Sequence, residues 1–285
     1  MQRSRTQNNN NNNNSNNQQQ QPPVLTMNKP LSIILDIEGT ISDIKFVSHI
    51  LLPFTRNNIR NYFDDHFDRD ECQEMIDRLR QTRRYYPDYP QILPLSAGKS
   101  LVVKTVSEYA LTHIVNRNRM SEIKQLQILL WIWGYENGLL RGHVYDEVTT
   151  VLHNWKHSQQ IKIYVFSSAM VSAQQLLLCC TNHGNCLPLI TDFFDSSIGD
   201  KCNPQSYWNI SQIIGESPGK ILFITDNNKE AKAALSANYC VCLIKRTDGG
   251  CSYKKTSPTT SSTTTIQYTD DGIPIINTLE DIKFY

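Results

Sequence analysis

Long apolar runs are missing from this sequence. No stretch of about 18 apolar residues is present, so we expect no segment that crosses a membrane. An excess of charge of either sign is also missing: 28 Lys and Arg residues stand against 27 Asp and Glu residues, a formal net charge of +1. This balance gives no general attraction to nucleic acid or to a membrane surface. We therefore expect neither as a partner.

The eight cysteines include no Cys-x-x-Cys pair of the kind that begins a zinc finger. The N-terminus is rich in Asn and Gln and lacks the apolar core of a secretory signal, which argues against an oxidising compartment. Cys240 and Cys242 alternate within an apolar run, as in a packed strand. We expect mostly reduced, structural thiols in a cytoplasmic protein, and a nuclear pool is equally compatible with the sequence.

Two polar tracts differ from the rest of the chain. Residues 8–21 are almost only Asn and Gln, and two prolines follow. Because such a tract cannot bury enough apolar area to offset the entropy lost on ordering, we expect residues 1–30 to form a disordered tail. The tail could mediate self-association, but we favour a solvated tail with no role in catalysis. A Ser/Thr-rich stretch predicts a surface loop over about residues 247–266.

Residues 33–40 read Ile-Ile-Leu-Asp-Ile-Glu-Gly-Thr, a short apolar run that ends on two carboxylates. The apolar part has the length and branching of a buried parallel strand. Asp36 and Glu38 therefore fall where the strand ends, the usual place for ligand chemistry in an open α/β sheet. An aspartate there can bind Mg²⁺ and can attack phosphorus, and Gly39 lets the backbone approach a phosphate. The alternative is a strand followed by an Asx-type turn without chemistry.

Helical periodicity dominates residues 48–145, where strand candidates are few. Two amphipathic helices are expected there, over residues 71–84 and over Ser121–Glu136, because apolar residues recur on one face of each. This block directly follows the first strand, so we expect it to lie over the strand ends as a helical cap.

Strands and helices alternate in the rest of the chain. Strands are expected at residues 161–166, 221–224, Cys240–Ile244 and about 273–276, and helices at residues 172–180 and 229–238. This alternation predicts right-handed crossovers and a parallel sheet. A length of 285 residues allows one large or two modest domains. The expected fold is α/β: a Rossmann-like parallel sheet core of residues 31–47 and 146–285, with the helical cap inserted after the first strand.

Polar side chains also follow the other expected strands. Ser167 and Ser168 could hold phosphate oxygens before a helix, and Lys201, in a loop with glycine, offers a point charge to a phosphoryl oxygen. Asp226 ends a strand, with Glu230 one helical turn later, and supplies the second carboxylate that Mg²⁺ needs. Taken singly, the serines could cap a helix, the lysine could be solvated and Asp226 could be an N-cap.

In this order, these elements resemble the four motifs of haloacid dehalogenase-type phosphohydrolases, and in detail the enolase-phosphatases of methionine salvage. The similarity covers about residues 31–246. It is carried by Asp-x-Glu-Gly-Thr at 36–40, Lys-Gln-Leu-Gln at 124–127 with Trp131, Tyr-Val-Phe-Ser-Ser at 164–168, Ile-Gly-Asp-Lys at 198–201 and Leu-Phe-Ile-Thr-Asp at 222–226. Two residues depart from the family pattern, because Ala169 and Ile128 stand where the family usually has glycine.

The resemblance implies a haloacid dehalogenase-like fold and a two-step reaction. The reaction converts 2,3-diketo-5-methylthiopentyl 1-phosphate, through an enol phosphate, into 1,2-dihydroxy-3-keto-5-methylthiopentene (acireductone). It also implies one Mg²⁺ per subunit and a small phosphorylated substrate as the partner, and we expect a monomer. The implied site residues are, for catalysis, Asp36 and Glu38, for the metal, Asp36, Glu38 and Asp226, and, for substrate binding, Ser167, Ser168 and Lys201.

Two alternatives stay open at the level of sequence. A phosphatase of the same superfamily could act on another small phosphorylated metabolite with the same chemistry. A non-catalytic scaffold could keep the fold and use the Asn/Gln-rich tail for association.

Overall fold

A parallel β-sheet forms the centre of the molecule in a computed structural model, which describes residues 23–118, 120–246 and 265–285. In spatial order its strands are β4 (Asp192–Phe194), β3 (Lys162–Phe166), β2 (Ser32–Leu35), β5 (Ile221–Thr225), β6 (Cys240–Ile244), β8 (Pro274–Ile276) and β7 (Gln267–Tyr268). All neighbours pair in parallel except β7, which runs antiparallel to β8 at the edge. The expected α/β class with a parallel sheet is confirmed.

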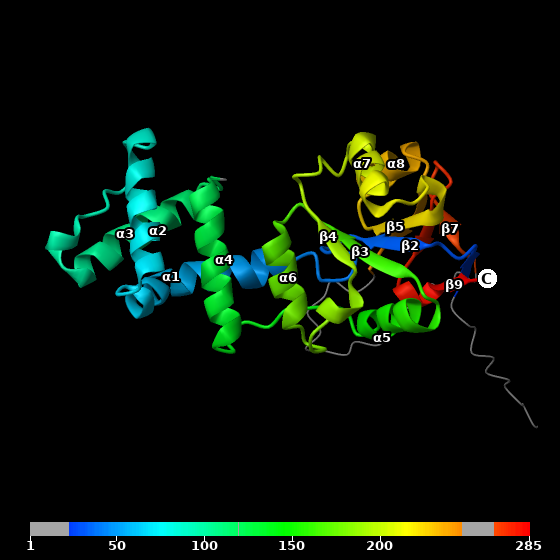
Figure 1. Cartoon of the computed structure of the whole chain (residues 1–285), viewed down its shortest axis with the longest axis horizontal. Coiled ribbons are helices and arrows are strands. Elements are labelled where there is room, and N and C mark those ends of the chain that lie inside the picture. The colour runs from blue at the N-terminus through cyan, green and yellow to red at the C-terminus, as the bar shows by residue number, and fades with distance from the viewer. Residues whose placement is uncertain (1–22, 119, 247–264) are drawn as a thin grey trace, which may run out of the picture.

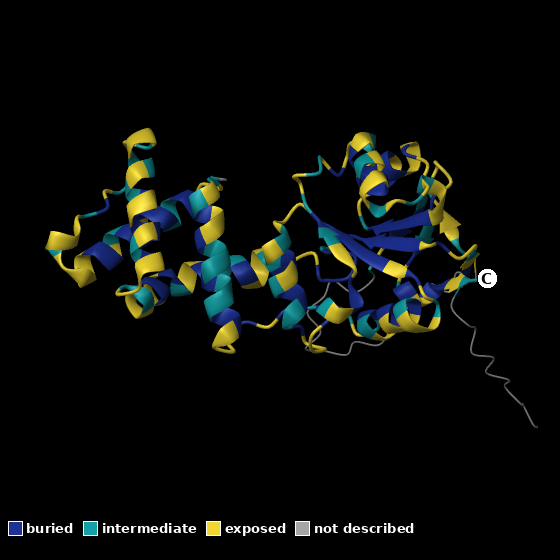
Figure 2. Ribbon diagram, viewed as in Figure 1, coloured by how far each residue is buried: buried dark blue, intermediate teal, exposed yellow. Residues whose placement is uncertain are grey.

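The central strand β2 is buried throughout because both faces of the sheet are covered, and three of its four residues are apolar. Successive side chains of a strand point to opposite faces. Ile33 and Leu35 accordingly join the cluster that contains α5 (Val148–His153) and α6 (Val171–Cys179). Ile34 joins the other cluster, with α7 (Pro204–Ile214) and α8 (Asn228–Ser236). Figure 1 shows α7 and α8 on one side of the sheet and α5 on the other, and Figure 2 shows the inner strands buried.

The cap is a separate helical unit with its own hydrophobic cluster. Its helices are α1 (Leu52–His66), α2 (Asp70–Thr82), α3 (Lys99–Val115) and α4 (Ser121–Glu136). Figure 1 shows them beyond the end of the sheet at which the chain leaves β2. The expected helix at residues 71–84 is α2, which ends two residues earlier in a 3₁₀ turn, and the expected helix at Ser121–Glu136 is α4. Among the described residues, no helix has both the length and the apolar character needed to cross a bilayer.

Short helical segments complete the chain. They are the π-helical turns Val47–Leu51 and Asn154–Ser158 and the 3₁₀ turns Arg83–Tyr85, Leu95–Ala97, Leu187–Leu189, Pro218–Lys220 and Leu279–Asp281.

The expected disordered tail, residues 1–30, extends too far toward the C-terminus, because part of it forms a strand. Residues 8–21 lie outside the described residues, but Leu25–Met27 forms the strand β1, which pairs in parallel with β9 (Ile282–Phe284) near the C-terminus. Leu25 is buried in the core. The fold brings these two segments together from distant parts of the sequence, and the Asn/Gln composition upstream does not reveal their pairing. Most of the expected Ser/Thr-rich loop, residues 247–264, lies outside the described residues.

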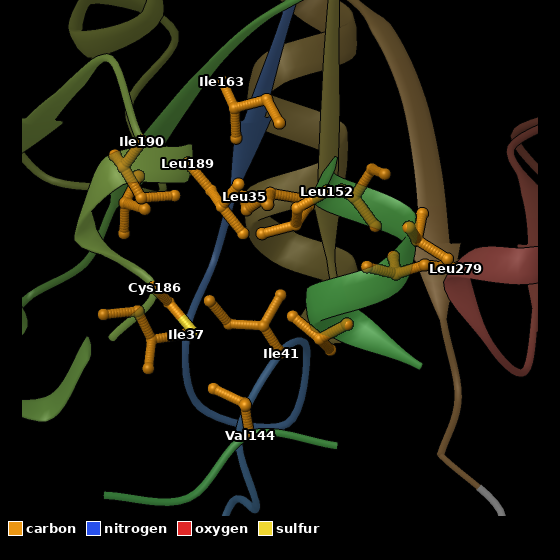
Figure 3. Close-up of a cluster of buried hydrophobic side chains, with 14 of the residues drawn as sticks. Leu35, Ile37, Ile41, Val144, Leu152, Ile163, Cys186, Leu189, Ile190 and Leu279 are labelled. Carbon is orange, nitrogen blue, oxygen red and sulfur yellow. The ribbon is translucent and has the colours of Figure 1, made fainter. Parts of the chain in front are cut away.

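The chain also re-enters the α/β core earlier than the expected cap boundary at residue 145. Leu140 and Val144 are buried in the core cluster rather than in the cap cluster. Figure 3 shows Val144 beside Ile37 and Ile41, which belong to the turn after β2, with Leu35 deeper in the same cluster. The turn after β2 is therefore anchored in the hydrophobic core by apolar contacts.

Candidate active site

A cavity of about 440 Å³ lies at the carboxyl ends of β2, β3 and β5. The structure brings all six predicted site residues to it: Asp36, Glu38, Ser167, Ser168, Lys201 and Asp226. The cause is the parallel sheet, in which the carboxyl ends of neighbouring strands share one edge. The register places Leu35, the last residue of β2, beside Val165 and Ile224.

Lys201 lies between two carboxylates at the floor of the cavity. Its Nζ is 2.6 Å from Asp36 Oδ1 and 2.7 Å from Glu230 Oε2. Thr225 Oγ1 donates to Glu230 Oε2 at 3.0 Å, and Asn227 Nδ2 donates to Glu230 Oε1 at 3.1 Å. The side chains of the lysine and the two acids are only 8–11% exposed. A buried ion pair is sustained by additional hydrogen bonds of this kind.

The two oxygens of Asp36 differ in their contacts. Oδ1 accepts hydrogen bonds from Lys201 and, at 2.7 Å, from the Ile37 amide. Oδ2 has a single weak contact among the described residues, from Thr225 Oγ1 at 3.3 Å. The carboxylate is therefore oriented through one oxygen, while the other remains available for chemistry.

Negative charge exceeds positive charge in the cavity. Burial raises the pKa of Asp36 to about 7, against the effect of Lys201, and Glu230 and Asp226 add to the rise. Burial also raises the pKa of Glu38, and burial together with Glu230 raises the pKa of Asp226. Burial alone would lower the pKa of Lys201, but Asp36 and Glu230 raise it, so the ammonium stays charged.

A divalent cation fits this charge balance and this set of oxygen ligands. Four carboxylates face one ammonium in the cavity lining. Within the described ranges, no group of three His, Cys, Asp or Glu side chains is arranged to hold a metal. A cation here would therefore use two carboxylates, main-chain oxygen and water, the usual ligands of Mg²⁺. Asp36 and Asp226 are the carboxylates that suit this role.

Gly39 has a role in the structure beyond the one that the sequence predicts. Its φ is +73°, and a Cβ atom there would lie 2.1 Å from Asp226 Oδ2. Glycine is thus needed because the turn after β2 packs against the Asp226 carboxylate. The approach of a phosphate to the backbone at Gly39, which the sequence predicts, stays a prediction.

The alternatives for single motifs do not match the structure. The N-cap of α6 is Met170, without a side-chain cap, and not one of the paired serines. The N-cap of α8 is Asn227, whose side chain accepts from the Lys229 amide, so Asp226 is free of that role. Lys201 is buried and ion-paired rather than solvated.

The paired serines lie between β3 and α6 with different exposure. Ser167 is buried, its amide donates to the Phe194 carbonyl, and its Oγ accepts from the Ala169 amide at 3.2 Å. Its hydroxyl hydrogen is left for a ligand. Ser168 is exposed and lines the cavity.

A second cavity of about 160 Å³ adjoins the first and shares Ser168 with it. One wall is a face of α4 with Lys124, Gln127, Ile128 and Trp131, and the other is the segment from Ser168 to Ala173 with Ser196. Trp131 is held by a hydrogen bond from Nε1 to Thr55 Oγ1 at 2.9 Å. Both departures from the family pattern, Ile128 and Ala169, line this cavity.

Sequence reasoning did not commit to Glu230 or Thr225 as site residues. Both lie in the buried network around Lys201, and the signal was available, because Glu230 follows Asp226 by one helical turn. It also missed α7, although Asn203 caps it, Pro204 begins it and Gly215 ends it with φ of +75°, which are standard signals for the start and end of a helix.

Comparison with family models finds no match. Among curated proteins, the chain is 36% identical to an enolase-phosphatase E1 from Drosophila willistoni, over 75% of this chain and 86% of the relative. It is 34% identical to an enolase-phosphatase E1 from Danio rerio, over 75% of this chain and 84% of the relative. Among solved structures, the UTR4 protein of Saccharomyces cerevisiae matches with a TM-score of 0.62 and 24% identity, over 79% of this chain and 94% of that one. This last likeness concerns the fold.

Proposed function

The chain belongs to the enolase-phosphatase E1 family, and from that premise we propose which of its residues carry out each step of the reaction. The enzyme is a phosphoric monoester hydrolase. It converts 2,3-diketo-5-methylthiopentyl 1-phosphate into 1,2-dihydroxy-3-keto-5-methylthiopentene, through an enol phosphate, in the salvage of methionine. The non-catalytic scaffold alternative is therefore not retained.

The position of Asp36 carries the proposal. Oδ1 is held by Lys201 and by the Ile37 amide, so Oδ2 is the oxygen that attacks phosphorus. The bond from phosphorus to the ester oxygen breaks as the aspartyl-phosphate forms. Attack requires the ionised carboxylate, which Lys201 favours, although burial has the larger effect and raises the pKa of Asp36 to about 7.

Glu38 is the proposed proton carrier. It lines the same cavity two residues after Asp36, and burial raises its pKa, which favours a protonated carboxyl. Its proton goes to the leaving enol oxygen, and the resulting carboxylate then takes a proton from the water that hydrolyses the aspartyl-phosphate. The Asp36 carboxylate is regenerated and inorganic phosphate is released. We assign to Glu38 the enolisation step as well, in which its carboxylate would take a proton from C1 and pass it to the C2 carbonyl oxygen.

Phosphate binding falls to Ser167, Ser168 and Lys201. Two of the three N–H groups of the Lys201 ammonium face carboxylates, which leaves one for a phosphoryl oxygen. The hydroxyl of Ser167 and the exposed Ser168 provide further donors. Fixed donors of this kind stabilise the charge that builds up on phosphorus in the transition state.

One Mg²⁺ per subunit, held by Asp36, Asp226 and the main chain of Glu38, is part of the proposal. The ion would neutralise phosphate charge and polarise the substrate oxygens. Its support is the excess of carboxylates over ammonium in the cavity. We also propose a monomeric, cytoplasmic enzyme, which could have a nuclear pool as well. The balance of 28 basic and 27 acidic residues supports the absence of a nucleic-acid or membrane partner.

The second cavity is the proposed site of the methylthio tail. It shares Ser168 with the phosphate end and has apolar walls from Ile128, Trp131 and Met170. A second candidate function follows from the same place: Ile128 and Ala169 narrow the cavity relative to glycine, which favours a phosphorylated metabolite with a smaller tail.

Purified protein with Mg²⁺ and the diketo phosphate tests these assignments. The ultraviolet absorbance of the enol species and the release of inorganic phosphate are followed together, with EDTA as the control. Enol formation followed by phosphate release, both lost with EDTA, supports the two-step assignment. Phosphate release from simple esters, with no turnover of the diketone, would support the second candidate instead.

A further inference from the structure

A buried arginine lies behind the catalytic turn, on the side away from the cavity lining. Arg246 lies two residues after the end of β6, and its side chain is only 8% exposed. It does not line the cavity that holds the six site residues. A guanidinium this deeply buried needs several partners to offset its desolvation.

The main partner of Arg246 is a single backbone oxygen. Its Nε donates to the Thr40 carbonyl at 2.9 Å, and its Nη2 donates to the same oxygen at 2.5 Å. Its Nη1 forms an ion pair with Glu147, and the guanidinium lies over the Tyr145 ring at 4.1 Å from the centroid. The fork of a guanidinium makes these contacts together, which the ammonium of a lysine cannot do.

The turn held in this way carries the catalytic groups. Thr40 is two residues from Glu38 and adjoins Gly39, which packs against the Asp226 carboxylate. Within the turn, the Thr40 amide donates to the Ile37 carbonyl and the Gly39 amide donates to the Ser42 carbonyl at 2.8 Å. A shift of the Thr40 carbonyl would therefore move the backbone of Glu38.

Further contacts hold both the turn after β2 and the segment that carries the partners of Arg246. The Tyr145 amide donates to the Ile41 carbonyl at 3.1 Å, so the segment that carries Tyr145 and Glu147 is itself tied to the turn. Ile37 and Ile41 are buried in the core beside Val144 (Figure 3). The turn after β2 is therefore held in two ways. Its isoleucine side chains pack in the apolar core, and the guanidinium of Arg246 donates to the Thr40 carbonyl.

We propose that Arg246 is a positioning residue, which sets the place of Glu38 for proton transfer by holding the carbonyl of Thr40. The inference rests on the proposed function only in assigning the proton to Glu38. Phosphate binding is separate, because within the described part of the chain Ser167, Ser168 and Lys201 form no hydrogen bond with Thr40 or Arg246. A defect in positioning should therefore affect the chemical step and spare substrate binding.

The test compares Arg246→Lys and Arg246→Gln with the wild-type enzyme. We expect kcat to fall by about tenfold to about a hundredfold, which misplacement of a catalytic group can cause. KM, and inhibition by inorganic phosphate, should stay within about twofold, because the phosphate donors are untouched. Arg246→Lys should retain more activity than Arg246→Gln, since the ammonium can still donate to Thr40.

Ile244→Val is the matched control. Ile244 is fully buried at the end of β6, two residues before Arg246, and it carries no polar side-chain atom. Hydrogen–deuterium exchange of the peptide covering residues 37–43 gives a readout that does not need turnover. It should exchange faster in both Arg246 variants and not in the control, while the peptide of β3 stays protected.

Three results would overturn the inference. The first is a wild-type kcat in both Arg246 variants. The second is an equal loss of kcat in Ile244→Val at equal loss of thermal stability, which would make the role merely structural. The third is unchanged exchange in residues 37–43. If the wild-type enzyme itself fails to turn over the diketo phosphate, the proposed function is wrong, and the exchange measurement still decides the role of Arg246.

Discussion

Replacing Lys201 with methionine removes the only ammonium that the described residues contribute to the cavity lining, and it keeps a side chain of similar length. Asp36 and Glu230 would then lie close together as carboxylates, each almost fully buried and without their shared cation. Breaking a buried ion pair by removing one partner costs about 3–5 kcal/mol. We expect the free energy of unfolding at pH 7.5 to fall by about this amount in the absence of metal.

The pH dependence of this loss separates charge from packing. Without the ammonium, the pKa of Asp36 should rise further above the value of about 7 that burial already gives it. A carboxyl whose pKa is raised by folding takes up a proton in the folded state first, so lowering the pH relieves the repulsion. The difference between Lys201→Met and the wild-type protein should therefore be largest above pH 7 and shrink toward pH 5.

Urea denaturation in EDTA at pH 7.5 and at pH 5.5 measures the effect. Lys232→Met is the control, because both side chains of its ion pair with Asp271 are exposed on the surface, where such pairs contribute little. A loss for Lys201→Met below about 1 kcal/mol at pH 7.5 would refute the picture of a buried, charged cluster. If the free energy of unfolding falls by the same large amount at both pH values, lost packing rather than charge would explain the effect.

Four further predictions follow from the site. Asp36→Asn should abolish phosphate release while the protein stays folded, as a phosphate assay and circular dichroism will check; most of the turnover remaining would contradict covalent catalysis. Gly39→Ala should cost about 1–3 kcal/mol through its positive φ and its clash with Asp226, and should weaken Mg²⁺ binding in a calorimetric titration. Removal of metal with EDTA should lower Tm, and the rise on adding Mg²⁺ should be larger at pH 8 than at pH 5.5, because protons compete for an Asp36 carboxyl with a pKa of about 7; an equal rise would exclude Asp36 as a ligand. Ile128→Gly should widen the second cavity and lower the KM of diketo phosphates with longer tails relative to the methylthio substrate; an unchanged KM ratio would place the tail elsewhere.

The resemblance was informative because its motifs are local. Each catalytic group follows an apolar run that pairs as a strand, and such runs can be recognised from a few neighbouring residues. The strands expected before Asp36, Ser167 and Asp226 agree with β2, β3 and β5 to within one residue at each end. Short or edge elements gave weaker signals, so β4, with three residues, and β1 were missed.

By itself, the sequence determined the α/β class, the helical cap, the chemistry of the carboxylates and the family, because periodicity and motif order depend on neighbours along the chain. Only the tertiary structure decided that Lys201 bridges Asp36 and Glu230, that Gly39 makes room for Asp226 and that Arg246 holds Thr40. Arg246 and Thr40 are 206 positions apart. Contacts of this kind depend on strand order, register and the closing of long loops, and no local pattern of residue types specifies them.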